Sequence, residues 1–74
     1  MKYVRHKTKG MFIFPDSQRV WHAHVGKFLG REGLVSAGFV RFVDGIPECY
    51  GDSESLTLGG AEDDTQVARN MMGL

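Results

Sequence analysis

The chain has 74 residues, 42% of them hydrophobic and eight of them aromatic, and its nine basic and nine acidic side chains give a formal net charge of zero at pH 7. This composition excludes an intrinsically disordered chain, and the length allows one domain, residues 1–74. The longest purely apolar run covers only residues 11–14, whereas a membrane helix needs about 20, so neither a membrane span nor a secretory signal is expected.

A domain of this size needs help to stay folded, because it buries only about 60% of the surface that its unfolded chain exposes. Cys49 is the only cysteine, which rules out an internal disulfide and suits a reducing cytoplasm. A structural zinc ion would need Cys49 with His6, His22 and His24, and these lack the paired spacing of zinc ligands. We therefore expect a dimer or an efficient small core, without metal or cofactor. The initial Met1 indicates a whole gene product.

A hairpin is expected at the start of the chain. Residues 3–6 lead into the polar, glycine-ended turn 7–10, and residues 11–14 are apolar and strand-like. Pro15 ends this second strand, and the Asp-Ser pair that follows is typical of a helix start.

The next expected element is a helix over about residues 17–29, with a start nearer to His22 as the alternative. At about 100° per residue, the apolar residues of this segment gather on one side. That side carries Val20, Trp21, His24, Val25, Phe28 and Leu29. His24 is thus expected on the apolar stripe, as a hydrogen-bonded core or interface residue, with His22 at its edge. The two rings point about 200° apart on a helix, so they cannot hold one metal ion.

The clearest local signal is a hairpin around Asp44-Gly45, the dipeptide that favours a two-residue turn. Such a turn sets the register of the flanking strands. It pairs Val43 with Ile46, Phe42 with Pro47, Arg41 with Glu48, Val40 with Cys49 and Phe39 with Tyr50. Arg41 and Glu48 then face each other as a stabilising cross-strand pair. Pro47 has no N–H for a ladder, so the second strand is expected to keep one free side.

The rest of the chain predicts one weak strand and a closing helix. Residues 53–58 alternate weakly and are expected to add a strand, which the glycines at 59 and 60 end. Residues 61–72 read as a helix with acidic residues in its first turn and Arg69 near its end, as the helix dipole favours. The predicted fold is α+β: a small antiparallel sheet with two helices packed on it, in the order β-β-α-β-β-(β)-α.

No segment carries a convincing catalytic motif, so we expect a protein without enzymatic activity. The "GDSES" of residues 51–55 resembles a nucleophile turn but lacks its second glycine and a large parallel sheet, so a polar turn is the simpler interpretation. Asp63 and Asp64 are explained as acids at a helix start. Cys49 is interpreted as a buried structural thiol.

Two kinds of partner remain. We favour another protein, or a second copy of the chain, bound by the apolar face of the first helix and the exposed edge of the 39–50 hairpin, because aromatic residues commonly supply interface energy. The candidate interface residues are Trp21, His24, Val25, Phe28 and Tyr50. The alternative is nucleic acid, because residues 1–43 carry eight basic and two acidic side chains while residues 44–74 carry one and seven. The candidate nucleic-acid residues are Lys2, Arg5, Lys7, Lys9 and Arg19.

Most of the chain after residue 20 resembles a group of small uncharacterised proteins encoded by bacteriophages and prophages. The segments that carry the resemblance are "HAHVGKFLG" (22–30), "VSAGFV" (35–40), "CYGDSESLTL" (49–58) and "EDDTQVAR" (62–69). The chain departs from this group by extra residues around positions 16–21. The resemblance implies a phage-type accessory protein in the bacterial cytoplasm, and it implies no activity.

Overall fold

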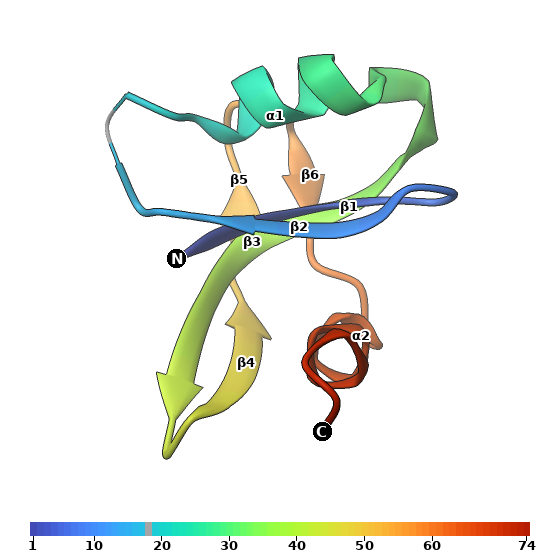
Figure 1. Ribbon diagram of the computed structural model, residues 1–74. Helices are drawn as coiled ribbons and strands as arrows, with labels where there is room; N and C mark the ends of the chain where they lie inside the picture. The colour runs from blue at the N-terminus through green and yellow to red at the C-terminus, as the bar shows by residue number, and fades with distance from the viewer. Residues whose placement is uncertain (18) are drawn as a thin grey trace.

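The computed structural model describes residues 1–17 and 19–74 (Figure 1). Its strands are β1 (Lys2–His6), β2 (Gly10–Phe14), β3 (Leu34–Val43), β4 (Ile46–Tyr50), β5 (Asp52–Ser53) and β6 (Leu58–Gly59). Its helices are α1 (His22–Leu29) and α2 (Asp64–Met71), and the short 3-10 helix η1 (Arg31–Gly33) joins α1 to β3. One antiparallel sheet has the order β2-β1-β3-β4, and β5 pairs with β6. The α+β class is confirmed.

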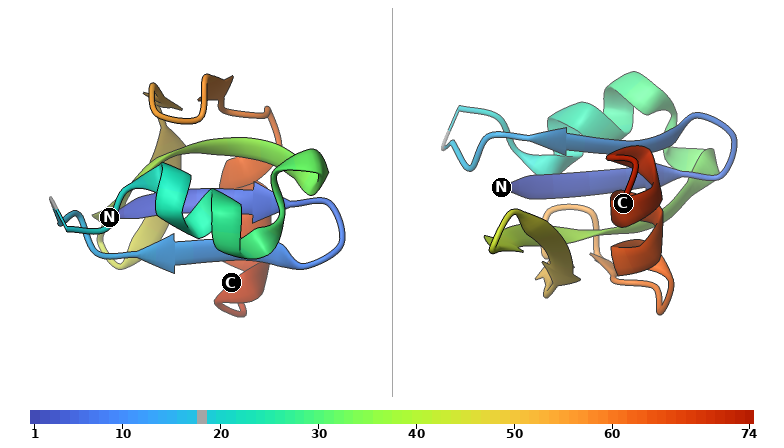
Figure 2. Two further views of the ribbon diagram at one scale, coloured as in Figure 1. Left: turned by 90° about the horizontal axis from the view of Figure 1, so that it is seen from above. Right: turned by 60° about the horizontal axis from the view of Figure 1, so that its bottom comes forward.

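The two helices cover opposite faces of the four-stranded sheet (Figure 1). Successive residues on a strand point to opposite faces, so β1 contributes to both. Val4 packs in a buried cluster with Leu29 of α1, whereas Tyr3 packs in another with Ala68 of α2. Seen from above, α1 runs over β1, with β2 on one side and β5 and β6 on the other (Figure 2, left). The small core is therefore divided between two layers of side chains.

The hairpin of β3 and β4 has the predicted register at all five positions, from Phe39 opposite Tyr50 to Val43 opposite Ile46. Asp44 and Gly45 both adopt positive φ angles, 52° and 78°, as a turn of this hand requires. Arg41 Nε lies 3.2 Å from Glu48 Oε2, which confirms the predicted cross-strand ion pair. This hairpin is specified by its own turn.

The first helix begins at His22, the later of the two expected starts, and its orientation differs from the prediction. The buried residues of α1 are His22, Gly26 and Leu29, whereas His24 is exposed. The expectation that His24 lies in the apolar stripe was wrong, and His22 takes the buried place. The reason is Gly26, which lets the helix approach so closely that an added Cβ would lie 2.9 Å from Leu56 Cδ2.

The segment 53–58 is not a continuous strand, contrary to the prediction. It forms a turn between β5 and β6, each only two residues long. The buried Ser53 side chain holds this turn, because its Oγ accepts a hydrogen bond from the Leu56 N–H at 3.2 Å. The turn thereby brings Leu56 under α1 as part of the core.

The two outer edges of the sheet differ. At the β4 edge, the Cys49 N–H donates to Thr65 Oγ1 of α2 at 3.0 Å, and Arg69 Nε donates to the Pro47 carbonyl at 3.3 Å. At the other edge, no strand within residues 1–17 and 19–74 pairs with the outer side of β2. The hairpin edge that was expected to be exposed is therefore partly covered by α2, and the open edge belongs to β2.

Candidate functional site

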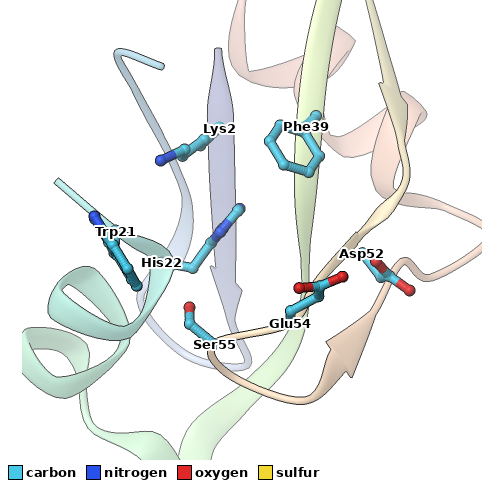
Figure 3. Close-up of a pocket in the computed structure, with 7 residues that line it drawn as sticks. All are labelled: Lys2, Trp21, His22, Phe39, Asp52, Glu54 and Ser55. Carbon is cyan, nitrogen blue, oxygen red and sulfur yellow. The ribbon is translucent and has the colours of Figure 1, made fainter. Parts of the chain in front are cut away.

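A pocket of about 280 Å³ opens at the start of α1 (Figure 3). It lies where the beginnings of β1 and α1 meet the middle of β3 and the segment that starts with β5. Its lining residues are Lys2, Trp21, His22, Phe39, Asp52, Glu54 and Ser55. The pocket thus combines aromatic rings with carboxylates, a histidine and a hydroxyl, all contributed by segments distant in sequence.

His22 forms the floor of this pocket and is only 5% exposed. Its Nε2 lies 2.6 Å from the Gly38 carbonyl oxygen, and because a carbonyl only accepts, this nitrogen carries the proton and donates. The ring is wedged edge-on between Phe14 and Phe39, with centroid distances of 5.8 and 5.3 Å. Among the described residues, none forms a hydrogen bond with Nδ1. In the neutral ring, this nitrogen is an acceptor.

Lys2 borders the pocket, but its charge is held by the loop that precedes α1. Its Nζ donates to the carbonyls of Ser17 and Val20, both at 3.1 Å, and lies 3.8 Å from Asp16 Oδ1. The ammonium group therefore already has two hydrogen-bond acceptors and a nearby carboxylate at the rim.

Ser55 of the "GDSES" segment lines the same pocket as His22, Asp52 and Glu54. The sequence did not predict this arrangement. In Figure 3, the Ser55 hydroxyl turns toward His22, whereas the Glu54 carboxylate lies below Phe39 and Asp52 lies beyond Glu54. However, Ser55 Oγ bonds to Ser53 Oγ at 3.4 Å, and no hydrogen bond joins it to His22 within the described part of the chain. The geometry lacks a nucleophile–base pair. The segment is a polar turn, as expected.

A second polar cluster lies on the opposite face of the sheet, around the Asp64 carboxylate, which is 1% exposed. It accepts hydrogen bonds from Tyr3 Oη at 2.5 Å, Ser36 Oγ at 2.7 Å, Arg5 Nη1 at 3.1 Å and the Ala61 N–H at 2.7 Å. Explaining this acid as a helix-start residue alone was therefore incomplete. Asp64 fastens the first turn of α2 to β1 and β3, and nothing in the local sequence signalled this.

Burial and hydrogen bonding shift the pKa values of Tyr3, Arg5 and Asp63 in and around this cluster. Burial, reinforced by Asp64, raises the pKa of the Tyr3 phenol far above its usual range. The hydrogen bond from Arg5 lowers the pKa of the exposed Asp63, and the same contact raises the pKa of Arg5. Burial also raises the pKa of the half-buried Cys49 thiol, which agrees with its interpretation as a structural residue.

Three of the five candidate nucleic-acid residues are held within the fold. Lys2 is bound as described above, Arg5 pairs with Asp63 and Asp64, and Lys9 Nζ donates to the Leu29 carbonyl at the end of α1 at 2.6 Å. Lys7 and Arg19 are exposed. The five side chains do not form one surface, because Lys2 and Arg5 point to opposite faces of β1.

The candidate interface residues separate into two places. Val25 and Phe28 lie on one flank of α1 that begins beside the N-cap residue Trp21, and Phe28 is 86% exposed. This flank borders β2, because Val25 packs against the same core cluster as Phe14 of β2, whereas Gly26 faces Leu56. Together with Phe12 and the open edge of β2 it is called the α1–β2 surface below. Phe12 lies opposite Val4 on the sheet, so it shares the face that α1 covers, and it is 40% exposed.

His24 and Tyr50 lie outside the α1–β2 surface. His24 is exposed, and its Nδ1 accepts the Trp21 backbone N–H at 3.1 Å, which helps to start the helix. Tyr50 is 45% exposed on β4, where its ring lies 5.8 Å from Phe39 and 5.0 Å from the Arg41 guanidinium carbon. Tyr50 is thus connected to the pocket through Phe39.

In the part of the chain that the structure describes, no three His, Cys, Asp or Glu residues are arranged to hold a metal ion. None of the helices found in residues 1–17 and 19–74 has the length and apolar character needed to cross a bilayer. Comparison with protein families, curated proteins and solved structures finds no match to this chain. Any function must therefore be argued from the surface itself.

Proposed function

We propose that this protein is a non-enzymatic binding protein that works as a homodimer, joined through the α1–β2 surface. The observation that carries this proposal is the 86% exposure of Phe28 on the helix flank beside an open sheet edge. Exposed apolar residues are ordinary when scattered, but a group of large ones beside unpaired backbone is a typical interaction surface.

The exposed apolar side chains supply about half of the area that a standard dimer interface needs from each chain. Trp21, Phe28 and Phe12 are 54%, 86% and 40% exposed. Since such side chains bury about 150–250 Å² each, they offer on the order of 400 Å² per chain, about half of what one partner contributes to a standard interface. Pairing of the strand edges would supply much of the remainder.

The open edge of β2 also suits a second copy of the same strand. Residues 10–14 carry no charged side chain, so two copies meet without like-charge repulsion. Antiparallel pairing of identical strands has two-fold symmetry, and this symmetry places the same patch of each chain against its partner. The two α1 flanks would then lie on the same face of one continuous sheet.

A phage or prophage origin and action in the bacterial cytoplasm belong to this proposal, and the resemblance of residues 22–69 supports them. Nucleic-acid binding has less support, because three of its five candidate residues are engaged in contacts within the fold.

Light scattering at several protein concentrations tests the proposal. We expect the mass of two chains for the wild type, and we expect Phe28→Ser to weaken the dimer more than about a hundredfold, because each chain loses about 1.5–3 kcal/mol of apolar burial. Phe42→Ser is the matched control, since Phe42 is 44% exposed but points to the α2 face. A wild type that stays monomeric at every concentration, or equal weakening by both variants, contradicts the proposal.

A further inference from the structure

We propose that the pocket at the start of α1 binds the cationic side chain of a lysine or arginine in a basic segment of a partner protein. This site is separate from the α1–β2 surface, apart from Trp21 at the corner where the two meet, and it does not depend on dimerisation.

The chemistry of the pocket is that of hydrogen-bond acceptors. Asp52 and Glu54 form no ion pair with any residue in the described ranges, so their charges are available to a ligand. In its neutral form, His22 offers Nδ1 as an acceptor, since its Nε2–H is donated to the Gly38 carbonyl. The Ser55 hydroxyl also accepts. An ammonium or guanidinium group supplies donors for all of them, and charged partners make the stronger hydrogen bonds.

Aromatic rings complete the environment that a cation favours. Trp21 and Phe39 line the pocket, and a cation over such a ring is attracted to its face. A cation–π contact of this kind occurs beside the pocket, where the Arg41 guanidinium carbon lies 5.0 Å from the centre of the Tyr50 ring. Tyr50 in turn contacts Phe39.

Lys2, which borders the pocket, does not itself occupy the position proposed for the cationic ligand. The Lys2 ammonium is bound to the Ser17 and Val20 carbonyls and lies near Asp16, outside the group of acceptors. An anion would meet the carboxylates of Asp52 and Glu54, while the Lys2 ammonium is already bound by the Ser17 and Val20 carbonyls. The charge balance of the pocket therefore selects a positive ligand.

The size of the pocket favours a side chain over a larger free ligand. A volume of about 280 Å³ lies at the lower end of ligand sites and holds one extended side chain. Tyr50, which is 45% exposed and contacts Phe39 of the pocket, offers contact to the neighbouring residues of a peptide. This is why a protein segment, not a free amine, is the proposed occupant.

The test uses three probes: Nα-acetyl-arginine methylamide, its neutral citrulline counterpart, and a six-residue peptide of glycine and serine with one central arginine. Trp21 is the only tryptophan, so its fluorescence reports on the pocket, and amide NMR shifts locate the contact. We expect the arginine probe to bind at the pocket, the citrulline probe to bind at least several-fold more weakly, and the peptide to bind more tightly than the single residue.

Substitutions separate the pocket from the rest of the surface. Glu54→Gln and Asp52→Asn should each weaken arginine binding by about three- to tenfold, as expected when a charge-assisted contact is lost. Glu62→Gln, an exposed acid that does not line the pocket, should leave it unchanged. Phe28→Ser protein should bind as the wild type does, so this result is independent of the dimer.

Three outcomes would overturn the inference. Equal affinity for the arginine and citrulline probes would show that the positive charge does not contribute to binding. Unchanged binding in both Glu54→Gln and Asp52→Asn would show that the arginine probe does not bind in this pocket. Equal affinity for the peptide and the single residue would point to a free amine and contradict a protein segment as the occupant.

Discussion

Asp64 shows how much of this fold depends on one side chain. Its carboxylate is the meeting point of Tyr3, Arg5 and Ser36 from two strands and of the turn before α2. A buried carboxylate is costly unless its oxygens are hydrogen-bonded, and here four donors converge on it. The sequence offered only an acid near a helix start, because partners 28 to 61 residues away leave no local pattern.

Tyr3→Phe gives a pH-dependent test of this cluster. At pH 7 the variant should be less stable by about 1–2 kcal/mol, because Asp64 loses one donor. The pKa of Tyr3 is raised in the fold, so its contribution is fully present below the unfolded-state pKa of about 10 and is lost as the pH rises further. Above that pH, wild-type stability should fall relative to the variant by up to about 1.4 kcal/mol per pH unit. Denaturant titrations between pH 7 and 12 measure this, and a constant difference would refute it.

Some secondary-structure elements of this fold are determined by local sequence, whereas others depend on contacts with distant residues. The β3–β4 hairpin was predicted residue by residue, since Asp44-Gly45 alone sets its register. The existence of α1 was also predicted, but its orientation was not. The apolar pattern placed His24 inward, whereas the close approach of Gly26 to Leu56 and Leu34 turns His22 inward instead. A helix eight residues long has too few positions for its pattern to decide its buried face.

The sequence likewise predicted only part of the candidate site. Trp21 and Phe28, two of the residues proposed from the sequence as a contact surface, are exposed, and Val25 is half-buried. The pocket was not foreseen, because Glu54 and Ser55 come to line the same pocket as His22 only through the turn between β5 and β6. The expected continuous strand would have carried them elsewhere.

Substitutions at Gly26 test the packing of α1. Gly26→Ala should change stability by less than about 1 kcal/mol, because better helix propensity offsets crowding against the movable ends of Leu56 and Leu34. Gly26→Val should destabilise by about 1–3 kcal/mol, since its branched side chain forces α1 away from the sheet. Thermal unfolding of the two variants side by side provides the measurement, and a valine variant as stable as the alanine variant would show that α1 is not closely packed.

At the scale of the whole molecule, α2 shields what the sheet would otherwise expose. Cys49 lies behind it, with its N–H bonded to Thr65 and its side chain packed against the Tyr3 and Ala68 cluster. Asp64→Ala should loosen α2 and increase the reaction rate of Cys49 with a thiol reagent several-fold at pH 8, because local opening controls access. Phe42→Ser, on the same face but away from the Asp64 cluster, should leave the rate close to that of the wild type. An unchanged rate in Asp64→Ala would mean that other contacts hold α2.

The unequal edges of the sheet also set a limit on assembly. A four-stranded sheet that is open only at its β2 edge can pair with one other copy, because both β2 edges are then occupied in the resulting dimer. If α2 came loose, β4 would become a second open side, and each chain could then accept a neighbour at both ends. In the proposed dimer, the short C-terminal helix, fastened to the sheet through Asp64, Thr65 and Arg69, is therefore what separates a closed pair from an unlimited filament.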